Sequence, residues 1–137
     1  MVDAERLRRI LQRVSGDVAT LREYAAVESA ALLNSPAQLG HVKYLFITAI
    51  EGCIDAAQHV CSSEGWDPPD TNAEAVRILG RRSVNDADLS DAIAAAVGFR
   101  NLLVHGYATV DDSRVVEALK RIGDVEAFVA GVSRLAR

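Results

Sequence analysis

Four polar side chains crowd into the stretch FRNLLVHGY, residues 99–107, at the end of an apolar run. They are Arg100, Asn101, His105 and Tyr107, which lie within eight consecutive positions. An arginine guanidinium suits bidentate phosphate contacts, and a histidine imidazole exchanges protons near neutral pH. These residue types make the stretch a candidate functional site, although their spacing by itself does not establish catalysis.

The spacing of these residues leaves a structural alternative open. On an ideal helix Arg100 and Tyr107 lie within about 20° of each other, whereas His105 lies about 140° from Arg100. We expect Gly106 to end the helix in the left-handed conformation and so turn Tyr107 away from its ideal direction. A basic residue in a last turn followed by glycine is also ordinary helix capping, in which case the tyrosine packs on the end of the bundle.

The composition of the whole chain favours one helical domain. The 137 residues are half apolar, with few aromatic residues and three prolines. Such a chain is long enough for one core, so we expect a single all-α domain over residues 1–137. The net charge of −4 excludes a surface that is positive throughout, so any nucleic acid must bind a local basic patch.

The apolar spacing divides the chain into four long helices and one short one. Their expected ranges are about 3–33, 37–63, 72–81, from 85 or 86 to 106, and 112–135. The short connection after the first helix makes an antiparallel pair of the first two. Thr71 with Glu74 is a capping-box pattern that opens the short helix, and Asn85 or Asp86 opens the next one. Gly65 is placed to take a left-handed cap.

Cys53 and Cys61 predict no disulfide with each other. They lie eight residues apart on one expected helix, about 12 Å along its axis, whereas a disulfide needs Cα atoms within about 7 Å. We interpret them as buried reduced thiols. The charged, amphipathic start of the chain is not a signal peptide, and no apolar run reaches the ~18 residues of a membrane span. We therefore expect a soluble cytoplasmic protein with no membrane contact.

The residues Arg100, His105 and Tyr107 resemble the R-x4-H-x-Y signature of the HEPN superfamily, and Asn101 falls where that superfamily commonly has a polar residue. The order of elements is similar to the HepT branch, also known as DUF86. A long first helix precedes a second with AIEGCIDAAQHV, then come a turn with Gly and Pro, a short helix, FRNLLVHGYATVD and a closing helix. The resemblance covers nearly the whole chain and implies a HEPN-type up-and-down bundle of four long helices plus one short helix.

The resemblance also implies an activity, that of a metal-independent endoribonuclease, the toxin of a type VII (HepT/MntA) toxin–antitoxin pair. Cleavage of RNA without a metal needs an internal nucleophile, which the ribose 2′-OH provides. The resemblance then makes His105 a general base or acid, and Arg100 the group that holds the scissile phosphate. Asn101 would orient the histidine or donate a hydrogen bond to the phosphate. No metal and no cofactor are expected.

A homodimer and a protein partner follow from the same resemblance. HEPN proteins are typically dimers, and a two-fold dimer would bring two copies of the motif to one cleft, so we expect Arg100 and His105 near its interface. Tyr107 would be the residue to which a minimal nucleotidyltransferase antitoxin attaches AMP, and that adduct would block the cleft. A packing role for Tyr107, and further assembly with the antitoxin, stay open.

The motif also fits a non-catalytic HEPN module that binds nucleotide or docks a nucleotidyltransferase, although retention of the full motif favours the enzyme. Asp55 is placed either to hold Arg100 by a salt bridge or to be a solvated carboxylate. His41 and His59 lie about 27 Å apart along one helix and cannot share a metal. A basic cluster near the end of the short helix is either a solvated cap or an RNA-binding rim, and it consists of Arg77, Arg81 and Arg82.

Overall fold

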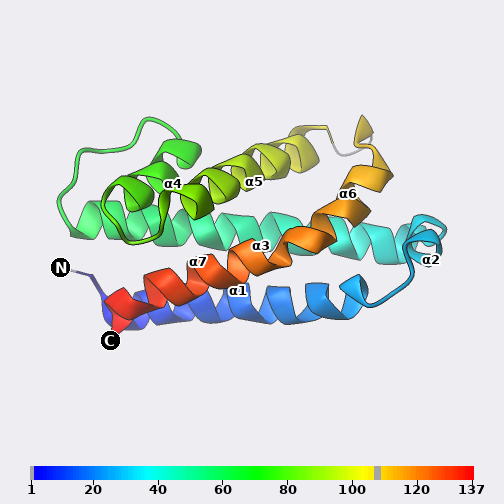
Figure 1. Cartoon of the computed structure of the whole chain (residues 1–137), viewed down its shortest axis with the longest axis horizontal. Coiled ribbons are helices and arrows are strands. Elements are labelled where there is room, and N and C mark those ends of the chain that lie inside the picture. The colour runs from blue at the N-terminus through cyan, green and yellow to red at the C-terminus, as the bar shows by residue number, and fades with distance from the viewer. Residues whose placement is uncertain (1, 107–108) are drawn as a thin grey trace.

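Every regular element in the described part of the chain, residues 2–106 and 109–137, is helical in the computed structural model (Figure 1). In chain order the elements, with 3-10 helices marked η, are α1 (Ala4–Ala25), α2 (Ser29–Leu33), α3 (Pro36–Ser63), α4 (Asn72–Arg81), α5 (Ala87–His105), α6 (Asp112–Ala118), η2 (Leu119–Arg121), α7 (Ile122–Ser133) and η3 (Arg134–Ala136). The predicted all-α class is confirmed.

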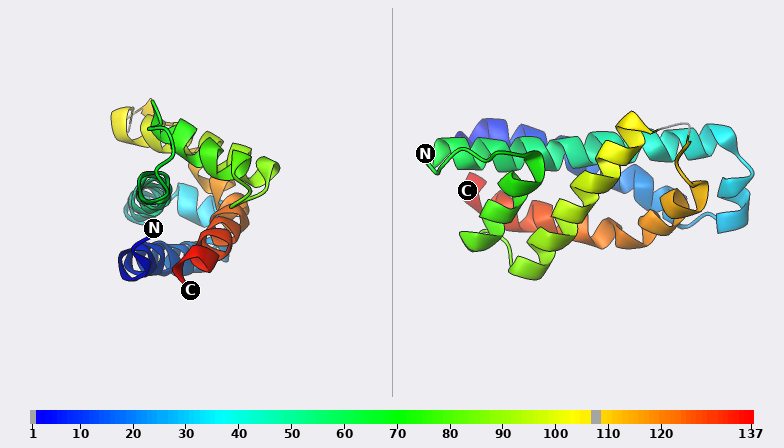
Figure 2. Two further views of the ribbon diagram at one scale, coloured as in Figure 1. Left: turned by 90° about the vertical axis from the view of Figure 1, so that its left-hand side faces the viewer. Right: turned by 90° about the horizontal axis from the view of Figure 1, so that it is seen from above.

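The helices surround one apolar core. α3 runs through the middle, with α1 packed along one side and α4 and α5 on the other, while α7 returns across α1 (Figure 1; Figure 2). Both termini lie at the same end of the bundle. Seen from above, α5 crosses α3 obliquely, so that only part of its length lies over α3 (Figure 2). This crossing decides which α3 side chains the end of α5 can reach.

Close packing of α1 on α3 depends on a glycine. A methyl group added at Gly52 would lie 2.3 Å from the Val14 Cγ2 atom, which is closer than side-chain carbons approach one another. Val14 is fully buried and branched at Cβ, so it has little freedom to move aside. The two helices therefore pack at a separation that Gly52 permits and a larger residue would not.

The first helix ends earlier than its apolar spacing predicts. The prediction of one helix to residue 33 is wrong, because α1 ends at Ala25 and the short α2 follows with Glu28 in an extended conformation. Leu32 continues the apolar spacing, but it is buried because α2 packs against α3 and α6. The spacing therefore does not reveal the break.

Side-chain caps fix the starts of α4 and α5 where the sequence predicts them. The Thr71 hydroxyl oxygen accepts a hydrogen bond from the Glu74 N–H at 3.0 Å, and an Asp86 carboxylate oxygen accepts one from the Leu89 N–H at 2.8 Å. Gly65 has φ of 69° just after α3, which confirms the expected left-handed cap. These boundaries follow from local chemistry, so they are predictable from short stretches.

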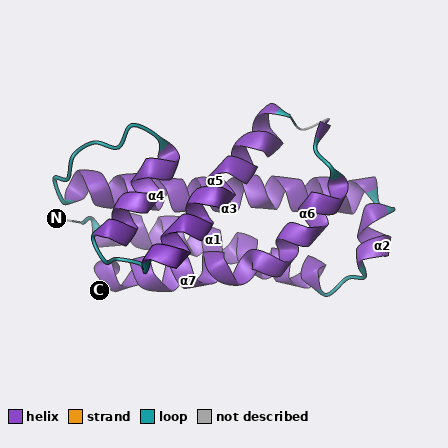
Figure 3. Ribbon diagram, turned by 45° about the horizontal axis from the view of Figure 1, so that its top comes forward, coloured by secondary structure: helices purple, strands orange, loops and turns teal. Residues whose placement is uncertain are grey.

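The last helix is bent. One helix over residues 112–135 was expected, but a turn of 3-10 helix, η2, interrupts it between α6 and α7, and the two follow a bent path (Figure 1). From Asp112 to Ser133 the chain stays helical through the bend (Figure 3). The bend lets α6 contact α3 and α2 while α7 packs on α1.

Both cysteines are buried free thiols, as predicted. Burial raises the pKa of the Cys53 thiol to about 12 and raises that of Cys61 as well, because a thiolate loses its hydration in the core. Among the described residues, none of the helices has the length and apolar character needed to cross a membrane.

Candidate active site

The last two turns of α5 direct Arg100 toward α3. Ile93, Val97 and Arg100 share one face of the helix, and the first two are buried. The Arg100 side chain is 21% exposed, so its guanidinium lies at the margin of the core and not in open solvent.

Two neighbours hold the Arg100 guanidinium. Its Nη2 atom donates to a Glu51 carboxylate oxygen at 2.9 Å, and its Nη1 atom donates to the Asn101 side-chain oxygen at 2.9 Å. Its Nε atom is buried and has no partner among the described residues. Of about five N–H donors on a guanidinium, one on each terminal nitrogen is left for a ligand. Arg100 is therefore fixed in direction and still able to bind a phosphate oxygen.

Glu51 is the acid that holds Arg100. Of the two alternatives for Asp55, the salt bridge to Arg100 is wrong, and the solvated carboxylate agrees with a side chain that is 57% exposed. Asp55 instead pairs with Arg13 of α1 at 3.3 Å. Glu51 and Asp55 lie one turn apart on α3. The sequence therefore does indicate an acidic partner for Arg100 in this part of α3, but it does not say which of the two acids it is. The oblique crossing of α5 selects Glu51 as the partner.

His105 is the last residue of α5 and is exposed, as is Asn101. The Asn101 side-chain oxygen accepts a hydrogen bond from Arg100. Asn101 therefore does not bond to His105, as its expected role of orienting the histidine would require. The helix ends with the Gly106 N–H donating to the Leu102 carbonyl at 2.8 Å. The structure thus places His105 and Asn101 on the solvent-exposed surface of the last two turns of α5.

Gly106 does not adopt the left-handed conformation that was expected. Its φ is −123° and its ψ is 31°, values open to other residues, and its carbonyl accepts from the Thr109 N–H at 2.9 Å. The helix therefore ends without a glycine-specific cap. Tyr107 lies outside the described residues.

Two uncovered apolar side chains flank the motif. Val104 follows Arg100 by four residues, on the same face of α5 as the buried Val97, and yet it is 42% exposed. Tyr44 precedes Glu51 by seven residues on the same face of α3 and is 60% exposed. The faces that bring Arg100 and Glu51 together thus continue into an uncovered apolar surface.

An ion pair anchors the segment that follows the motif. The Lys43 ammonium of α3 lies 3.0 Å from a carboxylate oxygen of Asp112 in the first turn of α6. The Lys43 side chain is only 11% exposed, so the pair is partly shielded from water. It ties the start of α6 to α3 next to the end of α5.

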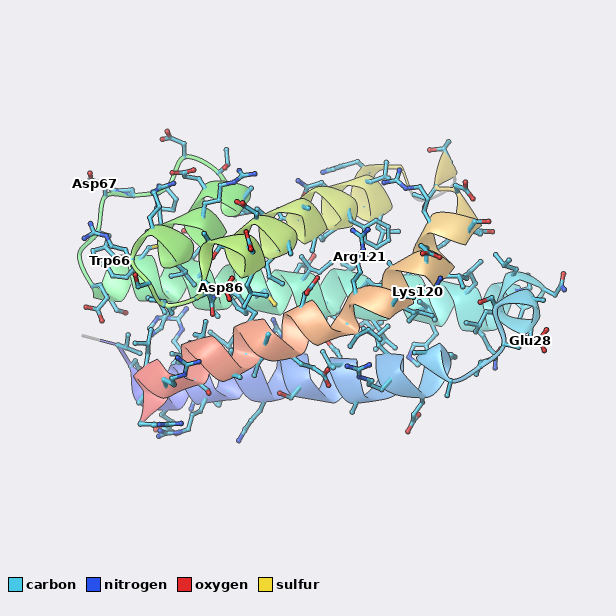
Figure 4. The ribbon with its side chains drawn as sticks, viewed as in Figure 1. Glu28, Trp66, Asp67, Asp86, Lys120 and Arg121 are labelled. Atoms are coloured by element: carbon cyan, nitrogen blue, oxygen red, sulfur yellow. The ribbon has the colours of Figure 1, made fainter. Side chains whose placement is uncertain are left out.

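The remaining candidate residues lie away from the motif. The Tyr24 hydroxyl and His41 Nδ1 are 2.7 Å apart, and His59 accepts from the Asp3 backbone N–H. In the basic cluster, Arg81 pairs with Glu74, and the Arg82 guanidinium lies 5.0 Å from the centroid of the Trp66 ring, which is labelled in Figure 4. Within the part of the chain described, no three His, Cys, Asp or Glu side chains are grouped as a metal site.

Known proteins share this fold, and some are also similar to this chain in sequence. The HEPN toxin of Shewanella oneidensis, solved in a tri-AMPylated form in complex with MNT antitoxin, aligns with a TM-score of 0.86 and 19% identity, covering 98% of this chain and 99% of that chain. The cytosolic protein YutE of Bacillus subtilis aligns with a TM-score of 0.86 and 15% identity, covering 98% and 90% of the two chains. The fold is thus that of the HEPN toxins.

Sequence comparison defines the family. The mRNA nuclease HepT of Shewanella oneidensis is 24% identical over 120 residues, which cover 87% of this chain and 82% of the relative. The family described as Ribonuclease HepT-like matches residues 3–132. The chain therefore belongs to the HepT-like ribonuclease family.

Proposed function

We propose that residues 1–137 form a single HepT-like domain that acts as a metal-independent endoribonuclease, the toxin of a type VII toxin–antitoxin pair. The observation that carries the proposal is the state of Arg100, which Glu51 and Asn101 hold in place while donors remain free on its terminal nitrogens. The exposed His105 follows five residues later on the same helix. This arrangement suits a phosphate that is bound next to a proton-transferring group. A relative named as an mRNA nuclease supports the choice of RNA.

The reaction uses the ribose 2′-OH as the nucleophile. A base removes the 2′-OH proton, the 2′ oxygen bonds to the adjacent phosphorus, and the bond from phosphorus to the 5′ oxygen breaks. An acid protonates the departing 5′ oxygen, so the products are a 2′,3′-cyclic phosphate and a 5′-OH. His105 acts in these proton transfers, and Arg100 offsets the charge that builds on the phosphate oxygens.

A homodimer completes the site, because one histidine is not easily both base and acid in a single step. Two-fold symmetry supplies two copies of His105 and Arg100 to one cleft. The exposed Tyr44 and Val104 support an interface beside the motif, since large apolar side chains are unfavourable in water. The paired guanidinium groups would concentrate positive charge locally in a chain of net charge −4.

Tyr107 is the control point in this proposal. A minimal nucleotidyltransferase antitoxin attaches AMP to its hydroxyl, and the bulky anionic adduct blocks the cleft and competes for Arg100. Support comes from the Shewanella oneidensis HEPN toxin, which is tri-AMPylated in complex with its MNT antitoxin. The tyrosine follows His105 by two residues in this chain, so its modification would lie close to the motif.

The test is RNA cleavage in excess EDTA by the parent protein, His105→Ala and the control His41→Ala. His41 is also exposed but bonds to Tyr24 away from the motif. We expect the parent and the control to leave 2′,3′-cyclic phosphate ends at equal rates, and His105→Ala to lose about 10²-fold or more. Equal cleavage by His105→Ala would show that the site is elsewhere. A folded dimer that cleaves no RNA in a broad set would instead favour the non-catalytic binding module.

A further inference from the structure

A groove of about 580 Å³ lies on the other flank of α5 from the motif. Phe46 and Phe99 form its floor with their rings edge to face, the centroids 5.6 Å apart, and Ile50 lies beside them. One edge is a ledge of three alanines on α5, namely Ala92, Ala95 and Ala96. Small side chains on this edge let another helix approach closely. The groove is therefore an apolar surface shaped for a helical partner.

The opposite edge carries four charged residues of alternating sign. Along α6, η2 and α7 they are Arg114, Glu117, Arg121 and Asp124, spaced by three, four and three residues, and all four line the groove. We call them the charged row. Read in the reverse direction, the row has the opposite sign at every position. A two-fold axis near Leu119 would therefore place Arg114 against Asp124 of a second copy, and Glu117 against Arg121.

We propose that the charged row and the groove beside it form an isologous interface between two copies of this chain. An isologous interface requires charges that are complementary to themselves, because the same surface lies on both sides and every contact between two residues occurs twice. A contact of this kind would also remove the apolar floor of the groove from water. The proposed partner is thus a second copy of the same chain.

The row is available for pairing with another molecule. Arg114, Arg121 and Asp124 have no ion-pair partner among the residues that the structure describes, and Glu117 pairs only with Lys120 at 3.1 Å. That pair is exposed at 64% for Glu117 and 73% for Lys120, so it is weak and easily exchanged. Figure 4 shows Lys120 and Arg121 side by side at the bend, with Arg121 on the side of α5.

The balance of the row disfavours other charged partners. A nucleic acid backbone or an acidic peptide would meet the carboxylates of Glu117 and Asp124, and a basic peptide would meet Arg114 and Arg121. Only a partner of alternating charge in the antiparallel direction satisfies all four. A second copy of the row has this pattern.

This contact differs from the dimer proposed at the motif. Ala92, Ala96 and Phe99 face the groove, whereas Arg100 and Val104 lie on the α5 face toward Glu51. The two proposed contacts therefore use different faces of α5. Two different two-fold contacts on one chain join dimers into a larger assembly, so the groove contact adds one association step to the motif dimer.

Charge reversal tests the interface by sedimentation over a range of concentrations. Arg114→Asp and Asp124→Arg each place like charges together at two symmetric positions, so either variant should weaken this step about tenfold or more. In an equimolar mixture of the two variants, the new aspartate meets the new arginine and Arg114 meets Asp124, so association should return. The double variant should associate like the parent. Arg77→Asp and Asp91→Arg reverse exposed charges outside the groove and should change nothing.

Loss of one association step in each single variant, with recovery in the mixture, supports the interface. Parent-like association of the single variants, or failure of the mixture to recover, overturns it. Helical circular dichroism of each variant checks that the fold is retained. The readout does not depend on RNA cleavage, so a failure of the proposed ribonuclease activity leaves this result unaffected.

Discussion

Removing the Glu51 carboxylate should release Arg100 from its anchor. The Arg100 side chain is 21% exposed and the Glu51 side chain 40%, so their ion pair is intermediate in burial. Removing one partner costs about 0–1 kcal/mol in an exposed ion pair and about 3–5 kcal/mol in a buried one. We therefore expect Glu51→Ala to lower the free energy of unfolding by about 1–2 kcal/mol. With an unfolding entropy of about 2.1 cal/mol/K per residue, that is a fall in Tm of roughly 3–7 °C, measured by thermal unfolding.

The same substitution should slow RNA cleavage more than this stability loss implies. Misplacing a binding group by about 1 Å can cost ~10²-fold, so we expect kcat/KM to fall by about 10–100-fold with most of the change in kcat. Glu51 acts here as a positioning residue, through Arg100. Glu51→Gln keeps an oxygen that can accept from the guanidinium, so it should recover part of the loss. Initial rates on labelled RNA, with kcat and KM separated, provide the measurement.

Asp55→Ala is the matched control for this prediction. Asp55 lies one turn from Glu51 on α3 but pairs with Arg13, and both of those side chains are more than half exposed. Its removal should leave cleavage unchanged and lower stability by about 0–1 kcal/mol. Cleavage by Glu51→Ala at the parent rate or faster would refute the reasoning, because it would mean that the ion pair does not place Arg100 for catalysis.

Three further predictions concern packing, thiol reactivity and the motif interface. Gly52→Ala should clash with Val14 and lower the unfolding free energy by about 1–3 kcal/mol, whereas Gly16→Ala, at an open helical site, should raise it by about 0.5–1 kcal/mol in chemical denaturation. Because burial raises the Cys53 pKa to about 12, iodoacetamide at pH 8 should label this thiol only as fast as the protein opens, and rapid labelling without denaturant would contradict its burial. Val104→Asp should weaken the proposed motif dimer at least tenfold in sedimentation and reduce cleavage with it, and an unchanged dimer would exclude Val104 from the interface.

Local signals in the sequence predicted the starts of the helices well. Thr71 and Asp86 cap α4 and α5 because a side-chain oxygen reaches an N–H only three residues away. Gly65 takes the left-handed conformation for the same kind of local reason. Each of these features depends on a few neighbouring residues, so a short stretch contains all the information required.

Features that depend on distant contacts were not predictable in this way. The break after Ala25 leaves the apolar spacing intact, because Leu32 remains buried but against other helices. The η2 bend serves contacts of α6 and α7 with different partners. Gly106 ends α5 without a positive φ, although glycine after a basic last turn usually indicates one.

The sequence by itself determined the helical class, the motif and the family to which its residue spacing points, because periodicity, capping and a short signature are properties of neighbouring residues. Only the tertiary structure decided that Glu51, and not Asp55, holds Arg100, and that Val104 and Tyr44 are left uncovered beside it. The physical reason is the angle at which α5 crosses α3. That angle results from the packing of the whole core, and no segment of the chain contains it alone.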